Sequence, residues 1–558
     1  MPSRERWLAR GLFLVLIASL IGLITSFYLD HTQAYPQAGG QYKEGIFGQP
    51  RFINPVLAQT NDADRDLSRI IFSSLLKYDG QGNLISDLAQ RYSISEDGLT
   101  YEVTLKKNAL WHDKQPLTAD DVIFTIATIQ NPEYKSPLKI NWQGVKAEKI
   151  DEFSVKFILN TTYAPFLHNL TVGILPKHLW AGISPANFAL AEYNLKPVGS
   201  GPYKFKDINQ DKDGKVNSIE LARNKNFYLV SLENNGVKGP FIDNIIFRFY
   251  TNQEDLIKAY QKGKVDGLGF LPAGELSGIR NGSNIHRINL PAYYAVFFNQ
   301  TASKALSDKN VRLALAYATN KNEIIDQVLK GEGEAVESPL LSGWLGYTDQ
   351  TKIYDFSLEH AQNLLESNGW KDKNEDGIRE KEISGSEENL EITILTTNWP
   401  ELNQAAELIK SQWEKLGARI NLEIVNPTVI QQEYIRPRNY QALLFGEVLS
   451  ADPDPFAFWH SSQRKDPGLN LALYQNKDVD KLLEEARQEM NPEKRVEKYA
   501  EFQKKLTEDI PAMFFYSPTY LYPVNERIKG IEIERLAIHS QRFSQIENWY
   551  IKTNRVWK

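Results

Sequence analysis

The 558-residue sequence contains no cysteine, which excludes disulfide bonds, thiolate metal sites and cysteine nucleophiles. An excess of one charge sign is also missing. The 64 Lys and Arg against 70 Asp and Glu leave a formal net charge of -6, so no overall basic field exists to attract nucleic acid. Familiar catalytic motifs are absent as well, including the Gly-x-Ser-x-Gly elbow, the Walker loop and the His-Glu-x-x-His pair. These absences argue against an enzyme and against a nucleic-acid partner.

Long apolar runs are absent except at residues 11–29, which read GLFLVLIASLIGLITSFYL. The run carries no charge and is long enough to cross about 30 Å of hydrocarbon as a helix. Arg4, Arg6 and Arg10 precede it, so the N-terminus is expected in the cytoplasm and the remaining chain across the membrane. Cleavage after Ala34 would make the run a signal peptide, but its length favours a retained anchor. We therefore predict an extracytoplasmic body, in the periplasm or at the cell surface, anchored by the N-terminal helix.

The rest of the chain has the pattern of an α/β body. Polar and apolar residues alternate in YEVTLKK (101–107) and DEFSVKFIL (151–159), as they do in half-buried strands. LEITILTT (390–397), a helix ending at Gly417 and ARINLEIV (418–425) form a strand-helix-strand unit, which implies parallel strands. We predict at least two lobes, with function in the cleft between them.

Residues 84–126, LISDLAQRYSISEDGLTYEVTLKKNALWHDKQPLTADDVIFTI, resemble the signature of the family 5 extracellular solute-binding proteins, which include the oligopeptide- and dipeptide-binding components of ABC importers. Further segments follow in the order of that family: ILPKHLW, PVGSGPYKF, AYQKGKVDG, YYAVFFNQ, DKNVRLALAYATNKNEII, LLESNGW, SADPDPFAFWHSSQ and LTEDIPAMFFYSP. The resemblance covers about residues 40 to 540. It implies a two-lobed periplasmic-binding-protein-like fold of class II, the large peptide-binding type with an extra inserted domain, preceded here by one N-terminal transmembrane helix.

The resemblance also implies a domain plan. Its parts are residues 1–35 as cytoplasmic stub, membrane anchor or signal, and tether; residues 36–85, 196–288 and 516–558 as discontinuous domain I; residues 86–195 as inserted domain II; and residues 289–515 as domain III across a hinge. Many relatives are tethered by a lipid on an N-terminal cysteine, which is missing here, so the apolar helix would replace that tether.

The function that the resemblance implies is capture of peptides in the interdomain cleft and their delivery to the permease subunits of an ABC transporter. We expect a monomer that requires no cofactor, has no catalytic residues and binds no nucleic acid. Two alternatives remain open: the same fold binding a non-peptide ligand, and a membrane-anchored receptor or scaffold without transport.

The loop SADPDPFAF contains the first candidate for ligand binding. In peptide-binding relatives an aspartate of the matching loop binds the α-ammonium group of the ligand, so Asp452 is either this anchor or an Asp-Pro turn residue. Asp454 precedes a proline and is better explained as a helix cap. Gly446 and Glu447 occupy positions near which relatives often have an arginine for the ligand carboxylate. The ligands are therefore longer peptides held through their backbone, or they are not peptides.

Three aromatic residues and one histidine are further ligand candidates. Trp399 is either an aromatic wall of the cleft or packing at a helix entry. Tyr293 and Tyr294 begin a strand that is apolar on both faces, so at most one of them faces the cleft, and core packing is the alternative. His460 lies beside the Asp452 loop and is the one histidine of eight near the proposed cleft.

Two acidic loops have the spacing of calcium-binding EF-hand loops, in which oxygen ligands alternate along the chain and a glycine permits the turn. The candidate ligands are Asn209, Asp211, Asp213 and Glu220 in the first loop and Asp372, Asn374 and Asp376 in the second. Ordinary turns are also rich in Asp, Asn and Gly, so these loops are either structural calcium sites or plain turns.

Overall fold

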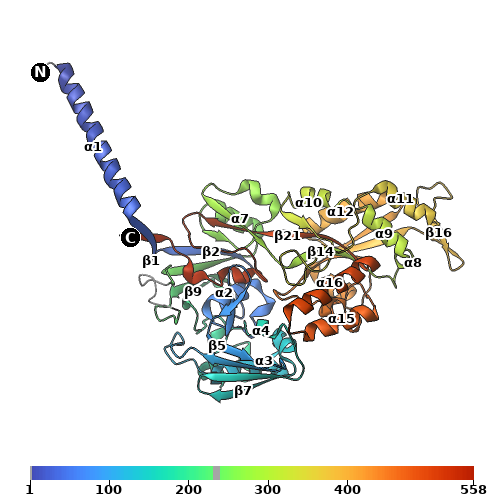
Figure 1. Ribbon diagram of the computed structural model, residues 1–558, viewed down its shortest axis with the longest axis horizontal. Helices are drawn as coiled ribbons and strands as arrows, with labels where there is room; N and C mark the ends of the chain where they lie inside the picture. Colours follow the sequence, from blue (N-terminus) through green and yellow to red (C-terminus); the bar gives the residue numbers. More distant parts are fainter. Residues whose placement is uncertain (1–2, 230–238, 558) are drawn as a thin grey trace.

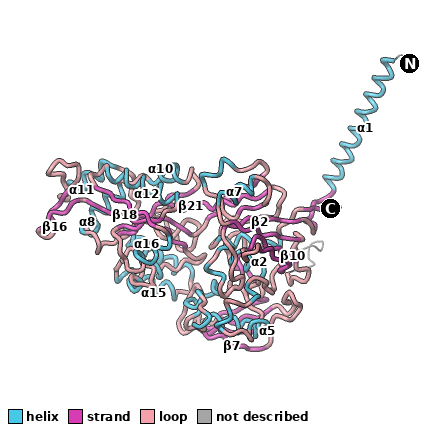
Figure 2. Tube along the Cα trace, turned by 180° about the vertical axis from the view of Figure 1, so that it is seen from behind, coloured by secondary structure: helices cyan, strands magenta, loops and turns pink. Residues whose placement is uncertain are grey.

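The computed structural model describes residues 3–229 and 239–557. An elongated body has one long helix, α1 (Ser3–His31), projecting from one end (Figures 1 and 2). Among the described residues α1 is the one helix that is long and apolar enough to cross a membrane, and its apolar window, Arg10–His31, is not buried against the body. The apolar helix predicted from the sequence is therefore present, as a candidate for either an anchor or a signal.

A mixed twelve-stranded sheet runs through the described part of the body, with β21 (Ala512–Asn525) near its middle. The order is β19, β18, β20, β14, β21, β12, β2, β11, β10 and β9, and β13 and β15 also pair with β21. The strands before residue 290 are β2 (Gln41–Phe47), β9 (Tyr203–Gln210), β10 (Val216–Arg223), β11 (Asn244–Tyr250), β12 (Gly267–Leu268) and β13 (Ser283–Asn289). The later ones are β14 (Ala292–Phe298), β15 (Gly333–Ala335), β18 (Glu391–Thr397), β19 (Arg419–Val425) and β20 (Ala442–Val448).

The β14 segment is apolar on both faces because both faces of this strand are buried. Tyr293 and Phe297 point into one buried cluster, whereas Val296 points into another on the opposite face of the sheet. At the nearby edge of the sheet, β18 and β19 are parallel and are connected through α12 (Pro400–Glu414). The strand-helix-strand prediction is therefore confirmed.

A smaller antiparallel sheet has the order β5, β6, β8, β7. Its strands are β5 (Ala89–Ile94), β6 (Thr100–Leu105), β7 (Val145–Asp151) and β8 (Ser154–Leu159), and α3 (Ala119–Gln130) packs beside them. Tyr101 and Val103 are buried while Glu102 between them is exposed, as the alternation predicts. Three two-stranded pairs complete the strands of the described chain: β1 (Thr32–Gln37) with β22 (Lys552–Trp557), β3 (Leu76–Tyr78) with β4 (Leu84–Ser86), and β16 (Glu380–Ile383) with β17 (Ser386–Asn389).

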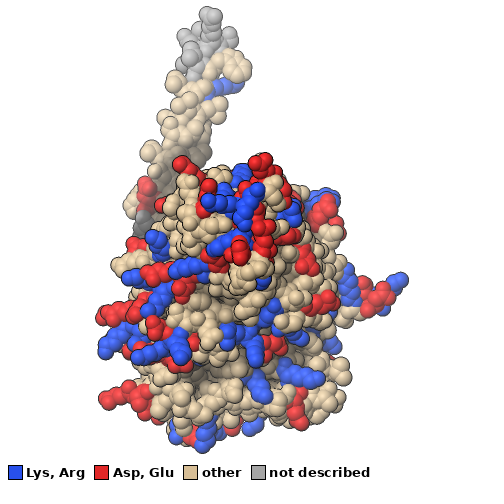
Figure 3. Space-filling model, turned by 90° about the vertical axis from the view of Figure 1, so that its right-hand side faces the viewer, with Lys and Arg blue, Asp and Glu red and all other residues tan. Residues whose placement is uncertain are grey.

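The remaining helices cover the sheets. They are α2 (Asp62–Ile71), α4 (Phe166–Asn169), α5 (Lys177–Trp180), α6 (Pro185–Phe188), α7 (Gln253–Gln261), α8 (Lys304–Ser307), α9 (Lys309–Tyr317), α10 (Lys321–Val328), α11 (Leu358–Ser367), α13 (Pro427–Val429), α14 (Phe456–Trp459), α15 (Lys477–Gln488) and α16 (Pro492–Asp509). On the face in Figure 3 both charge signs are interspersed over the body, while the coloured part of the projecting helix is mostly tan. This contrast matches a water-exposed body and an apolar helix.

Candidate functional site

Two stretches of chain cross side by side near the middle of the molecule. The first is the link between β13 and β14, just after Asn289, and the second lies within β21. Asn289 pairs with Thr519 in antiparallel register, while Ser517 and Pro518 pair with β15. The two ends of the large sheet are therefore connected at adjacent points, an arrangement that allows two lobes to rotate about a hinge.

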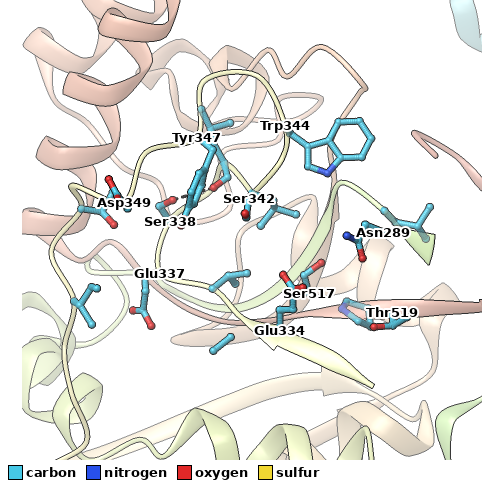
Figure 4. A pocket seen from close by; sticks show the side chains of 18 residues that line it. Asn289, Glu334, Glu337, Ser338, Ser342, Trp344, Tyr347, Asp349, Ser517 and Thr519 are labelled. Carbon is cyan, nitrogen blue, oxygen red and sulfur yellow. Dashed lines mark hydrogen bonds between the residues drawn. The ribbon is translucent and has the colours of Figure 1, made fainter. Parts of the chain in front are cut away.

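A cavity of about 120 Å³ lies against this crossing (Figure 4). Trp344 and Tyr347 give it aromatic walls, and Glu334, Glu337 and Asp349 contribute carboxylates, with no lysine or arginine among the described residues that line it. Ligand pockets usually measure roughly 300–1,000 Å³. A ligand of several residues therefore needs the lobes to move apart before it can enter.

Two of these carboxylates lack a compensating cation. Glu337 forms an ion pair with Lys321, at 2.5 Å between carboxylate and ammonium. Glu334 and Asp349 form no ion pair with any residue of the described chain. The cavity, which we call the hinge pocket, therefore carries uncompensated negative charge, which suits a ligand with a cationic group.

The loop that follows β15 is attached to a distant part of the chain. Arg535, beyond the end of β21, donates a hydrogen bond through Nη1 to the Gly343 carbonyl at 2.6 Å. Gly343 has a φ of +81°, and a Cβ at this position would lie 2.8 Å from the Arg535 guanidinium. A side chain at position 343 would thus be strained and would displace the arginine.

The segment containing the small sheet touches the helices after β20. Arg487 pairs with Asp454 at 2.9 Å, and its guanidinium stacks 4.2 Å from the Phe456 ring and 5.3 Å from the Tyr163 ring. The Tyr163 hydroxyl also donates to Asp454 at 3.3 Å, and the Ala164 amide donates to the Arg487 carbonyl at 2.8 Å. Asp454 accepts from the amide of Phe456 at 3.4 Å, the first residue of α14. Asp454 therefore lies one residue before the N-cap of α14, which is Pro455 rather than the predicted Asp454, and it also bridges two parts of the body.

Asp452 takes part in a second bridge of the same kind. The residue is 8% exposed, and its carboxylate pairs with Arg495 of α16 and lies 3.5 Å from His168 of α4. The other ring nitrogen of His168 shares a hydrogen bond with the Tyr78 hydroxyl at 2.6 Å. Burial, and to a lesser degree the Arg495 charge, lowers the pKa of His168 to about 4, so the imidazole is neutral near pH 7. Asp452 is thus compensated by Arg495 and does not line the hinge pocket; we call the two bridges, at Asp452 and at Asp454, the rim contacts.

The paired tyrosines of β14 point in opposite directions. Tyr293 is fully buried and donates its hydroxyl hydrogen to Glu447 of β20. Burial raises the pKa of Glu447 to about 8, so this acid keeps its proton at pH 7. Tyr294 covers Gly446 and packs 5.2 Å from the Tyr516 ring. Neither tyrosine lines the hinge pocket.

Trp399 and His460 lie in different surroundings. Trp399 is 50% exposed directly before α12 and has room for a ligand contact, but it does not line the hinge pocket. His460 is buried, stacks 4.1 Å from Phe456, and bonds Ser462 at 2.7 Å and Glu484 at 3.2 Å. The structure thus groups His460 with the rim contacts rather than with the hinge pocket, and the ligand-binding roles of Asp452, Trp399, Tyr293, Tyr294 and His460 stay predictions.

The first acidic loop connects β9 and β10. Asp211 accepts hydrogen bonds from the amides of Asp213 and Lys215, at 3.0 and 2.9 Å. Glu220 forms an ion pair with Lys206 at 2.9 Å, on the strands rather than in the turn. Asn209 accepts from the Asn217 side chain at 3.2 Å.

The second acidic loop follows α11. Asp372 accepts from the amides of Asp376 and Gly377, Asn374 also accepts from the Asp376 amide, and Asp376 accepts from the Ile378 amide at 2.8 Å. These bonds are those of Asp- and Asn-stabilised turns. Within the described chain no group of three or more His, Cys, Asp or Glu side chains is placed to hold a metal ion. Calcium in either loop stays a prediction.

The residues of the hinge pocket were missed by the sequence reading. Trp344, Tyr347 and Asp349 lie between β15 and α11, in a loop with no strand or helix of its own. Long irregular loops inside compact bodies are often binding loops, and this loop carries the segment SGWLGYTDQT. Its length and its aromatic, glycine and acidic residues were the available signal.

Comparison with known proteins identifies the fold. The family model described as bacterial extracellular solute-binding proteins, family 5, matches residues 83–468, more than half of the chain. The chain belongs to this family. Family 5 proteins bind substrates outside the cytoplasm and are not a family of enzymes, so this family 5 chain is an extracytoplasmic binding protein.

Similar proteins match it over nearly full length. The oligopeptide-binding protein AppA of Bacillus subtilis is 29% identical over 528 residues, covering 92% of this chain and 92% of AppA. The dipeptide-binding protein of Escherichia coli is 26% identical, covering 88% of this chain and 92% of its own. Among solved structures, AppA with a nonapeptide has a TM-score of 0.72 at 28% identity, covering 93% and 100% of the two chains. NikZ of Campylobacter jejuni with Ni(L-His) has a TM-score of 0.74 at 29% identity, covering 91% and 99%. The predicted family and fold class are confirmed.

Proposed function

We propose that this chain captures peptides between its lobes and delivers them to the permease of an ABC transporter. The observation that carries the proposal is the hinge pocket, which combines Trp344 and Tyr347 with carboxylates that have no cation partner. The same overall fold holds a nonapeptide in AppA of Bacillus subtilis. An extended peptide has a cationic amino end and apolar side chains, and the pocket offers a partner for each.

The amino end of the peptide is assigned to Glu334 and Asp349, because their charges are free. Asp452 would become available only if its pair with Arg495 opened. A desolvated ammonium-carboxylate hydrogen bond is stronger than a neutral one, so an unpaired acid is the better anchor. The chain acts as a monomer, without catalysis and without a required cofactor, and any calcium in the two acidic loops is structural.

We further propose that α1 is kept as the membrane anchor. The candidate cleavage position after Ala34 falls inside β1, and all six residues of β1 pair with β22. Cleavage there would cut a paired strand and remove half of it. A retained helix supports the body at the outer face of the membrane, close to the permease that receives the ligand.

A metal chelate is the second candidate ligand, because NikZ, at 29% identity, holds Ni(L-His). An acidic pocket also suits a cationic chelate. The two candidates differ in the mass that the protein would carry.

Native mass spectrometry distinguishes these ligands. The sample is the body from residue 36 onward, purified without denaturation. We expect adducts that resolve into peptides on release. Adducts of nickel with histidine would replace the peptide proposal by the chelate. A bare protein mass after exposure to both a peptide mixture and nickel-histidine would overturn capture of either ligand and favour a receptor or scaffold. Turnover of the added peptides would contradict the proposal that the chain is not an enzyme.

A further inference from the structure

The strand β22 fastens the far end of the chain to the base of α1. Register pairs Thr32 with Trp557 and Gln37 with Lys552, so β22 runs back toward the helix and ends beside it. Figures 1 and 2 show the C-terminal label at the foot of the helix. The body is thus attached to α1 through two strands rather than through one flexible tether.

Arg555 holds this junction by capping the helix. Its Nη2 donates to the carbonyls of Leu29 and Thr32 at 2.9 and 2.8 Å, and its Nε donates to the Thr32 hydroxyl at 2.8 Å. Its guanidinium also lies 5.8 Å from the Tyr28 ring. The last carbonyls of a helix lack intrahelical partners and carry partial negative charge, so a cation here satisfies both needs.

Aromatic rings surround the same junction. Trp557 lies 5.9 Å from Tyr28 and 6.4 Å from Phe27, yet it is still 61% exposed, and Val556 next to it is 41% exposed. At the other end of the helix, Trp7 is 73% exposed. At 1.5 Å per residue, Trp7 and Tyr28 are about 32 Å apart along the axis. This distance is close to the hydrocarbon thickness of a bilayer, and such aromatic pairs mark its two interfaces.

The charged residues of the two paired strands are all basic. The sequences TQAYPQ and KTNRVW contain Lys552 and Arg555 but no acidic residue. Basic residues next to a membrane span are attracted to anionic lipid headgroups. Exposed apolar rings beside cations are the composition of a surface that lies in the headgroup region.

We propose that β22 is a membrane-interface element that places Val556 and Trp557 among the lipid headgroups and fixes the body relative to the bilayer. This inference rests on the proposed retention of α1. It adds that a segment more than 500 residues away along the chain sets the height at which the cleft faces the permease.

The experiment uses the whole chain in nanodiscs of phosphatidylcholine and phosphatidylglycerol. Because the sequence has no cysteine, one introduced cysteine carries one fluorescent label. We compare Val556→Cys with Asn389→Cys, an exposed control at the end of β17 in the part of the body distant from α1 (Figure 1). The label at 556 is expected to show blue-shifted emission and quenching by lipids with spin labels near the headgroup, whereas the label at 389 shows neither.

Two further variants test the cause. Adding Trp557→Ser or Arg555→Ala to Val556→Cys is expected to remove most of the quenching while peptide capture by the body is kept. A label at 556 that is as water-exposed as the label at 389, in a chain whose intact mass still includes α1, overturns the interface element and leaves the anchor standing. A chain recovered from membranes without residues 1–34 overturns the anchor and with it this inference, and peptide capture is then still measurable.

Discussion

The hinge pocket and the rim contacts use the same types of charged residue in opposite ways. At the hinge pocket, Glu334 and Asp349 have no cation partner within the described chain. At the rim, Asp452 and Asp454 are each paired with an arginine. The unpaired acids are available to a ligand, whereas the paired acids also contact His168 and Tyr163 of the segment that contains the small sheet.

Charge is compensated within the chain at the rim but not at the hinge pocket. Unpaired charge in a small pocket suits a charged ligand, whereas the buried acids at the rim are already compensated by arginines. Under the proposed function, we expect peptide entry to break the contacts of Asp452 with His168 and of Asp454 with Tyr163, and we expect the bound peptide to compensate the acids of the hinge pocket.

The largest expected effect comes from breaking a rim pair. Arg495→Ala leaves the buried Asp452 carboxylate without its cation, which should lower the free energy of unfolding by about 3–5 kcal/mol. Urea unfolding measures this. The double variant Arg495→Met with Asp452→Asn should recover part of the loss, and a loss below about 1 kcal/mol, as for an exposed pair, would contradict a buried ion pair at this position.

Glu447 is a third kind of acid, because it is buried and has no cation partner among the residues that the structure describes. Burial raises its folded-state pKa to about 8, above the unfolded value of about 4.3. The folded state then binds the proton more tightly, so this group's contribution to stability is present at low pH and declines as pH rises from about 4.3 through about 8. Glu447→Gln should flatten the decline in urea unfolding measured between pH 5 and pH 8. If the slope of unfolding free energy against pH does not change, Glu447 ionises like an exposed acid. Glu334→Gln is the control at an exposed acid.

Arg487 tests the second rim contact. Arg487→Met keeps the bulk of the side chain but removes the pair with Asp454 and the cation–π contacts, together worth about 1 kcal/mol. We expect the ligand-free protein to open more often. Spin labels on Ser93→Cys and Lys504→Cys, in the two parts that meet here, should report a longer mean distance. The same distance in both proteins would show that this contact does not hold the lobes.

The hinge-pocket acids have the smallest expected effects. Glu334→Gln and Asp349→Asn should each weaken peptide binding about two- to fivefold, the value of a partly exposed charge pair. Calorimetry with a peptide recovered from the protein measures this, and Asp213→Asn, in the β9–β10 loop, is the matched control. If Glu334→Gln and Asp349→Asn bind the peptide as tightly as the unchanged protein and Asp213→Asn do, these two acids are not part of the ligand site.

Local features of the fold could be predicted from the sequence. The spacing of Thr118 and Asp121 predicts a capped helix, and at the start of α3 the Asp121 carboxylate accepts from the Thr118 amide at 2.9 Å. Asp308 likewise caps α9 by accepting from the Asn310 amide. Such features depend on residues two to four positions apart, which is the range that sequence patterns describe.

The site could be predicted only in part, because its contacts join distant residues. Asp452 stands out in its loop, but its partners Arg495 and His168 come from two helices on either side of it in the sequence. No periodic pattern predicts that they meet. Trp344 and Tyr347 lie in an irregular loop, where side-chain direction follows from tertiary packing rather than from spacing.

The most direct test of whether the hinge pocket is the binding site is hydrogen exchange of the body. It is measured with and without a tryptic digest of casein as the source of peptides. Bound peptide should protect the amides of residues 334–353 and 517–519, which line the pocket. Protection confined to the rim around Asp452 and Asp454, with the pocket segments unchanged, would contradict the account and return the ligand to the predicted Asp452 anchor.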